Sequence, residues 1–143
     1  MGAVNYKLYH HRDFIKTEAS GTLDLESSKA MIRKMALLSK NLPREHDVIF
    51  DLRGARCELP VEDRIELVRE LTRHRFAFRN KIAVLVHDEE HLLRSRFTSM
   101  CAGLEGFQVL GFMGFEEALE WVNAPFAELQ DVQAEEDEEM ENR

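Results

Sequence analysis

The sequence predicts an α/β fold, with a mixed sheet of about five strands and about four helices. Two short apolar runs, residues 48–52 (VIFDL) and 81–87 (KIAVLVH), have the length and composition of fully buried strands. Each run is followed by a longer segment with apolar residues at helical spacing. Buried strands that alternate with helices require right-handed parallel crossovers, and an N-terminal β-hairpin adds an antiparallel edge to the parallel strands.

Two segments near the N-terminus predict that hairpin. Residues 4–9 alternate apolar and polar side chains, which is the period of a half-buried strand, and residues 14–20 form the second strand. A helix follows. Asp24 or Ser27 can cap it by accepting a backbone hydrogen bond, and residues 41–43 (Asn-Leu-Pro) end it.

The second half of the chain repeats strand and helix. Pro60 lies near the start of the helix after the first buried run, where its missing N–H costs nothing. Asp88 caps a helix that extends to about Ala102. Residues 107–112 are the last predicted strand, and residues 115–122 are the last predicted helix.

The negative charge of the chain is concentrated at its C-terminus. The 143 residues are enough for one domain, which we place at residues 1–127. Residues 128–143 hold eight acidic residues and one basic residue, so they carry −7 of the net charge of −8. Such a segment buries too little apolar surface to fold, so we predict a disordered acidic tail. One role for this tail is to keep the protein soluble. The alternative is that the tail competes for a basic partner.

Composition argues against several classes of protein. No apolar run approaches the roughly 18 residues of a membrane span, and the N-terminus has no apolar signal-peptide core. Cys57 and Cys101 show no CxxC spacing, which favours a cytoplasmic protein with reduced thiols. The body outside the tail is close to neutral and lacks a long basic face, so we predict no nucleic-acid partner.

A predicted loop, residues 53–60, carries the first candidate site. Arg53, Arg56 and Arg64 could converge near the N-terminus of the following helix and bind an anion. The alternative is that these arginines lie on the surface and pair with neighbouring acidic residues. Cys57 in the same loop is either a nucleophile whose pKa the arginines lower, or a small semi-buried side chain.

Catalysis and metal binding have little support in the sequence. A nucleophilic cysteine needs a histidine base, and only His87 can come near Cys57. Residues 87–91 (HDEEH) match the HxxEH pattern of zinc peptidases, which requires both histidines on one face of a helix. His87 ends a predicted strand, so that geometry fails. We therefore predict a protein that is not an enzyme and has no metal or cofactor.

A second candidate cluster, residues 73–81, combines basic residues with Phe76 and Phe78. One interpretation is a contact with nucleic acid or an anionic membrane. The other is a helix end where cations complement the helix dipole and the phenylalanines pack inward. Phe76, Phe78 and Phe97 could also line a pocket for a ligand, although such residues more often belong to a core.

Three motifs in order connect the chain to a known family: residues 21–27 (GTLDLES), 48–56 (VIFDLRGAR) and 112–122 (FMGFEEALEWV). Together they resemble the STAS domain, and specifically its SpoIIAA-like branch, which groups with the CRAL-TRIO lipid-carrier folds. The resemblance covers about residues 4–123 and implies a STAS-like mixed sheet. It also implies binding rather than chemistry, since members of the family bind partner proteins or small, lipid-like ligands.

The chain departs from the family at one position. In the anti-sigma-factor antagonists a serine at the start of the helix after the third strand is phosphorylated, whereas the matching residues 53–63 contain no hydroxyl side chain. We therefore predict a non-catalytic regulatory or protein-interaction module without that serine. Its partner, a protein or a second copy forming a homodimer, would contact residues 53–60 and the next helix. The alternative is a carrier of a small, anionic or lipid-like ligand at the C-terminal edge of the strands.

Overall fold

The computed structural model describes residues 4–11, 14–42 and 46–122; the predicted acidic tail, residues 128–143, lies outside them. The strands are β1 (Asn5–His10), β2 (Phe14–Leu23), β3 (Asp47–Cys57), β4 (Lys81–Leu85) and β5 (Gln108–Phe112). The helices are α1 (Leu25–Lys40), α2 (Val61–Arg73), the 3₁₀ turn η1 (Arg75–Ala77), α3 (Glu89–Leu104) and α4 (Phe115–Trp121). None of these helices is both long and apolar enough to cross a bilayer.

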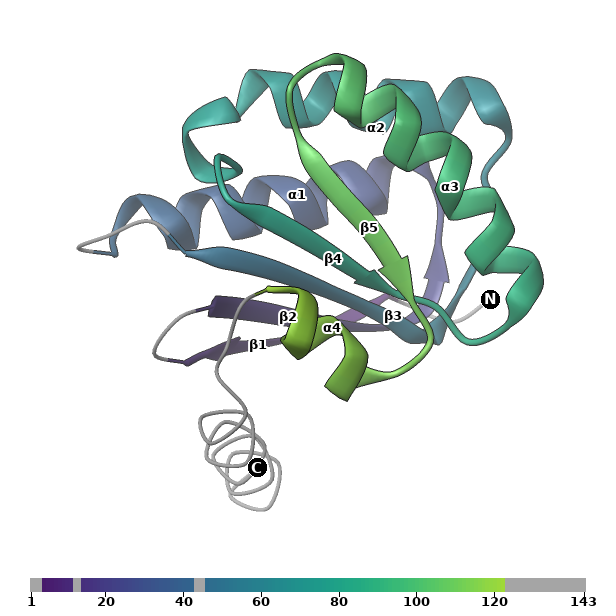
Figure 1. The fold of residues 1–143 in the computed structure, drawn as a ribbon, viewed down its shortest axis with the longest axis horizontal. Helices are drawn as coiled ribbons and strands as arrows, with labels where there is room; N and C mark the ends of the chain where they lie inside the picture. The colour runs from purple at the N-terminus through teal and green to yellow at the C-terminus, as the bar shows by residue number, and fades with distance from the viewer. Residues whose placement is uncertain (1–3, 12–13, 43–45, 123–143) are drawn as a thin grey trace.

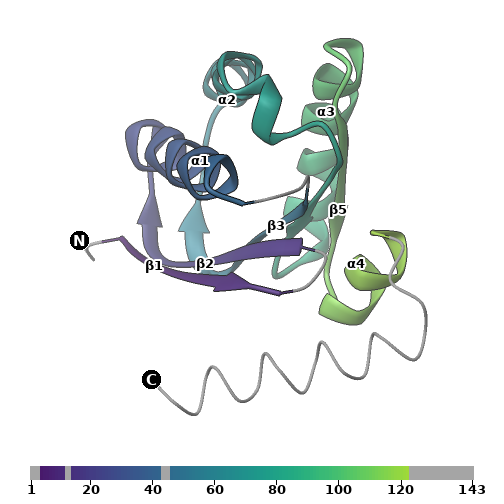
Figure 2. The same ribbon diagram turned by 90° about the vertical axis from the view of Figure 1, so that its left-hand side faces the viewer.

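The five strands form one sheet in the order β1-β2-β3-β4-β5. β1 is antiparallel to β2 and the other pairs are parallel, which confirms the predicted α/β class with its N-terminal hairpin. Helices α1, α2 and α3 lie along one side of the sheet, and α4 lies on the other (Figures 1 and 2). A parallel sheet needs cover on both faces, so each side has its own core.

The two cores differ in size. The larger one joins the sheet to α1 and α2, with Phe50, Met35 and Phe78 among its buried members, while α3 contributes a buried alanine, Ala102. The smaller one lies under α4 and includes Phe14, Ile49, Leu85, Phe115 and Leu119. The side of the sheet that faces α3 therefore receives few large apolar side chains from that helix.

Local capping explains where two of the helices begin. The Asp24 carboxylate accepts a hydrogen bond from Ser27 N (2.8 Å), and Ser27 Oγ accepts one from Asp24 N (2.9 Å), so both predicted candidates cap α1 together. Asp88 Oδ1 accepts a hydrogen bond from His91 N (2.8 Å) and caps α3, as predicted. The side chain of Asp88 is thereby fixed at the start of α3.

A buried carboxylate ties α1 to α2. The side chain of Glu70 is only 2% exposed and contacts Arg33 Nε (3.2 Å), Arg73 Nη1 (2.9 Å) and His74 Nε2 (3.0 Å). Burial by itself raises the pKa of Glu70, but the hydrogen bonds from Arg33 and His74 outweigh it and hold the pKa below its usual value. The ionised carboxylate therefore fixes the spacing of the two helices.

The prediction that residues 53–60 form a loop is wrong for the first half of that range. β3 continues to Cys57 because β2 continues to Leu23 and pairs with it, a partner that a local apolar pattern does not show. The pairing is interrupted once: two residues of β3, Leu52 and Arg53, stand opposite one residue of β2, Ala19. This is a β-bulge, which reverses the side on which the following residues point.

The bulge decides which side chains of β3 face α1, α2 and α3. Strict alternation from Phe50 would direct Gly54 and Arg56 to that face. The extra residue instead directs Ala55 and Cys57 there, and both lie on the same cavity wall as Phe50. The cavity wall here therefore consists of short, uncharged side chains. Regular pairing would instead have buried the side chain of Arg56.

Candidate functional site

A cavity of about 170 Å³ lies between the sheet and the helices α1, α2 and α3. Its walls are mostly apolar. The sheet supplies Phe50, Leu52, Ala55, Cys57, Ile82, Val84 and Val109; the helices supply Ser28, Met31, Ile32, Arg64, Leu67, Leu71, His91, Arg94, Ser95, Thr98 and Ser99; the connections supply Leu59, Val86 and His87. The cavity reaches the C-terminal ends of β3 and β4, where ligands commonly bind in sheets of this kind.

Four polar atoms of this lining have no hydrogen-bond partner among the described residues. They are Ser28 Oγ, Arg64 Nε, Thr98 Oγ1 and Ser99 Oγ, and all four are buried. Ser28 as a whole is 2% exposed. A buried polar group without a partner costs about 1–3 kcal/mol. The four atoms belong to residues of the lining, and a molecule in the cavity reaches them when the side chains rotate toward it.

The three predicted arginines do not converge on one anion site. Arg53 forms a paired contact with Asp51 in its own strand, Nε to Oδ1 at 2.9 Å and Nη2 to Oδ2 at 2.8 Å, and does not line the cavity. Arg56 is exposed, because the bulge turns it away from the helices. Arg64 alone lines the cavity, and its Nη1 donates to the carbonyl oxygen of Arg94 (2.8 Å).

The three phenylalanines do not line the cavity, and Phe78 matches the alternative in which such residues belong to a core. Phe78 is 1% exposed and belongs to the larger core, packed near Phe50 with ring centroids 6.3 Å apart. Phe76 and Phe97 are exposed, and none of the three lines the cavity. Phe50 is the phenylalanine of the lining.

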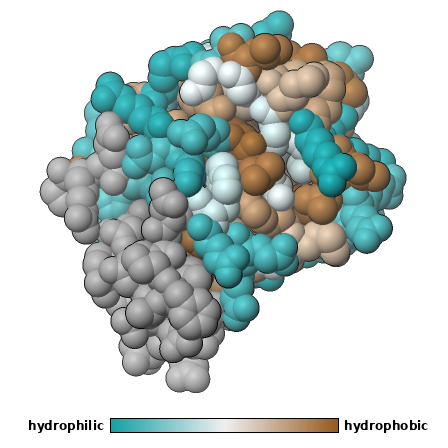
Figure 3. Space-filling model, viewed as in Figure 1, coloured by the Kyte–Doolittle hydropathy of each residue, from teal (hydrophilic) through white to brown (hydrophobic). Residues whose placement is uncertain are grey.

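Helix α3 directs its large apolar residues outward. Leu93, Phe97, Met100 and Leu104 are exposed and recur at the spacing of one helical face. The side that lines the cavity carries His91, Ser95, Thr98 and Ser99. Figure 3 shows hydrophobic side chains gathered on the face formed by β5 and α3. The amphipathic pattern of α3 is therefore reversed relative to a helix that fills a core.

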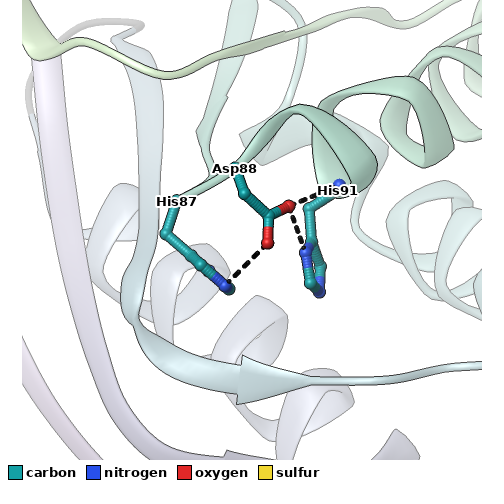
Figure 4. Close-up of side chains that lie close together, drawn as sticks. All are labelled: His87, Asp88 and His91. Atoms are coloured by element: carbon teal, nitrogen blue, oxygen red, sulfur yellow. Dashed lines mark hydrogen bonds and ion pairs between the residues drawn. The ribbon is translucent and has the colours of Figure 1, made fainter.

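One end of the cavity carries a cluster of His87, Asp88 and His91 (Figure 4). β4 ends at Leu85, so His87 lies in the connection before α3 rather than on the strand as predicted. The two histidines do not share one face of a helix, as expected, because His87 precedes α3. The two rings nevertheless lie close together, with centroids 4.6 Å apart. One donor atom from each of the three side chains lies within 4.8 Å of the others, so the three can hold a metal ion.

Hydrogen bonds orient His91 within this cluster. Its Nδ1 lies 2.7 Å from Asp88 Oδ1, and its Nε2 lies 3.1 Å from the carbonyl oxygen of Cys57. The bond to Asp88 raises the pKa of His91, and burial acts in the opposite direction. Glu58 lies beside the cluster and pairs with Arg94, Oε2 to Nη1 at 2.8 Å, which lowers the pKa of Glu58.

Cys57 is not an activated thiol. Burial raises its pKa, the carboxylate of Glu58 raises it further, and Arg64 only partly offsets both. The alternative in which neighbouring arginines lower the pKa of Cys57 is therefore wrong in direction. Its position on the cavity wall matches the second alternative, a small semi-buried side chain.

Several solved structures resemble this fold, among them the following two. One is an uncharacterised protein of the DUF3478 family with a SpoIIAA-like fold from Shewanella loihica PV-4, with a TM-score of 0.58 and 14% identity over 85% of this chain and 98% of that one. The other is the anti-sigma factor antagonist SpoIIAA in its unphosphorylated form, with a TM-score of 0.52 and 16% identity over 85% of this chain and all of that one. No family model and no curated protein matches the sequence.

The chain thus has a SpoIIAA-like fold, which confirms the fold that the three sequence motifs imply. Neither of the two similar proteins is described as an enzyme. At these identities the likeness concerns the fold alone.

The raised pKa of Cys57 predicts slow alkylation. At neutral pH iodoacetamide should modify Cys57 more slowly than it modifies a small free thiol, because less thiolate is present. Peptide mass spectrometry of the full chain separates Cys57 from Cys101, and a Cys57→Ser variant supplies the background rate. Modification of Cys57 as fast as a free thiol would contradict this assignment.

Proposed function

We propose that this chain binds a small, mainly apolar molecule that carries one hydrogen-bonding group. The cavity between the sheet and α1, α2 and α3 is the observation that supports the proposal: it is apolar, yet it contains buried polar atoms without partners. Ligand sites in general combine apolar walls with a few placed polar groups. This favours the carrier interpretation over the interaction module that the sequence favours.

The size of the cavity limits the ligand. An apolar cavity of about 150 Å³ in another protein holds benzene. A volume of about 170 Å³ therefore fits one aromatic ring or a short alkyl chain, but not a whole lipid. A longer chain would have to extend past the end of the cavity at His87 and His91.

The polar atoms define the chemistry of the ligand. Ser28, Thr98 and Ser99 offer hydroxyl groups, which both donate and accept. Arg64 adds a guanidinium that only donates, so the polar group of the ligand is neutral or anionic rather than cationic. A phenol or a short carboxylic acid meets these conditions.

A second candidate function is protein interaction, and the exposed apolar row on α3 favours it. We define this surface as Leu93, Phe97, Met100 and Leu104. It replaces the predicted partner surface at residues 53–60 and α2, where Val61 is the one exposed large hydrophobic residue among those described. Large apolar patches that remain exposed commonly mark interfaces.

We assign a second copy of the chain as the occupant of this surface. In the described sheet β5 pairs only with β4, so its other edge presents free backbone groups beside α3. A second copy offers the same edge. Antiparallel pairing of two β5 strands about a two-fold axis brings the two α3 surfaces together and covers edge and patch at once.

Two small probes test the cavity. Benzene and phenol should both shift the backbone NMR signals of Phe50, Ile82 and Val84, since these residues line the cavity. Phenol should bind about 2- to 13-fold more tightly than benzene, because its hydroxyl supplies a partner worth about 0.5–1.5 kcal/mol.

Matched variants locate the binding. Val84→Phe places a ring in the cavity and should weaken phenol binding about tenfold or more. Leu37→Phe adds the same ring on the exposed face of α1, where Leu37 is 64% exposed, and should leave binding unchanged. Absence of signal shifts at the lining residues, or equal binding by both variants, would refute the proposal.

Oligomeric state tests the second candidate. Native mass spectrometry of the full chain at micromolar concentration should show a dimer, and the double variant Met100→Lys, Leu104→Lys should be monomeric because it charges the α3 surface. Leu37→Lys, equally exposed on α1, should remain dimeric. A monomeric wild-type chain, or a double variant that still dimerises, would remove this candidate.

A further inference from the structure

We propose that His87, Asp88 and His91 form a binding site for a divalent transition-metal ion such as Zn²⁺ at the end of the cavity. The inference does not depend on what the cavity itself binds. It starts from the juxtaposition of two imidazoles and a carboxylate at the start of α3, with a second carboxylate next to them.

The donor atoms already face one another. His87 Nε2 lies 3.2 Å from Asp88 Oδ2, and the two imidazole rings are 4.6 Å apart between centroids. Figure 4 shows the carboxylate of Asp88 between the two rings, with a nitrogen of each ring directed to the same side of the helix start. Zinc donors at about 2.0–2.2 Å from a tetrahedral ion lie about 3.3–3.6 Å apart, so a spread of 4.8 Å closes with a movement of roughly 1 Å. The side chain of His87 is 44% exposed and free to make it.

Asp88 supplies one ligand, and a backbone carbonyl holds the ring of His91. Oδ2 of Asp88 faces His87 and remains available, while Oδ1 accepts hydrogen bonds from N and Nδ1 of His91. A metal ion would replace the proton on Nδ1, and Nε2 would donate to the carbonyl oxygen of Cys57 at 3.1 Å, which fixes the ring. Metal-binding histidines commonly have their second ring nitrogen held by a carboxylate or a backbone carbonyl in this way.

Glu58 adds negative charge beside the site but not a ligand. Its Oε1 lies 3.5 Å from His91 Nε2, on the side of the ring away from Asp88 Oδ1, so it does not share a metal ion with Nδ1 of the same ring. Arg94 binds the other oxygen, Oε2, and so holds the carboxylate in place. Arg94 also binds Glu90. Around the site the carboxylates of Glu58, Asp88 and Glu90 outnumber the one guanidinium, which favours a cation.

The donor set selects the class of metal. Two imidazoles with one carboxylate suit Zn²⁺ and neighbouring first-row divalent ions, whereas Ca²⁺ and Mg²⁺ prefer oxygen ligands alone. The carbonyl oxygen of Cys57, and not its thiol, contacts His91. Because His87 and His91 line the cavity, a position on the metal not taken by protein would face that cavity.

Titration of the metal-free full-length chain tests the proposal. Isothermal titration calorimetry with ZnCl₂ at about pH 8, where protons compete less for the ligands, should show one site. His87→Ala should weaken the affinity about 10- to 100-fold. Asp88→Asn should weaken it similarly while preserving the helix cap, because asparagine caps as well as aspartate. His10→Ala, an exposed histidine outside the cluster, should bind as the wild type does.

Co²⁺ binding supplies a second readout. Metal bound only by acidic residues outside the described part of the chain would not give this signal. Co²⁺ in a site with imidazole ligands and four-fold coordination should give visible absorption bands that Zn²⁺ displaces and that His87→Ala abolishes. Equal affinity of the wild type, His87→Ala and Asp88→Asn for Zn²⁺ would overturn the proposal, and so would the absence of saturable binding. Unchanged melting temperatures of the metal-free variants establish that each one is folded.

Discussion

A parallel sheet must be covered on both faces, and in this chain the cover supplied by α3 is incomplete. The side of α3 that faces the sheet carries Ser95, Thr98 and Ser99, while Leu93, Phe97, Met100 and Leu104 face outward. Small polar side chains cannot fill the space over Val84 and Val109, so a cavity remains there. The same reversal leaves an apolar row exposed on the other side of the helix. One feature of α3 therefore accounts for both candidate surfaces.

The bulge in β3 and the cap at Asp88 complete the site from the other side. The bulge directs Ala55 and Cys57 to the cavity and turns Arg56 away from it, which keeps this wall short and uncharged. The cap fixes Asp88 at the start of α3 and holds His91 over the end of β3, where it contacts the carbonyl oxygen of Cys57. The cavity and the histidine cluster thus meet because two local features, a bulge and a helix cap, lie next to each other in space.

What the sequence predicts well is local, and what it misses depends on pairing between distant segments. The buried runs at residues 48–52 and 81–87 identify β3 and β4, and Asp24 and Asp88 identify two helix starts, because each signal lies within a few residues. The bulge depends on how β3 pairs with β2, and no pattern within β3 shows it. The orientation of α3 runs against its own periodicity, since an apolar row at helical spacing normally faces a core. Ser28, Thr98 and Ser99 belong to no sequence motif, so no pattern in the sequence indicates that they line the cavity.

The central claim is that the space between α3 and the sheet is a true apolar cavity. Diffraction from crystals of the full-length chain under xenon pressure tests it most directly, because xenon enters dry apolar cavities of this size. The account predicts a xenon peak in contact with Phe50, Ile82 and Val84, with Leu93 and Phe97 still exposed on α3. A rotated α3 whose leucines and Phe97 fill the space, with no xenon peak there, would contradict it.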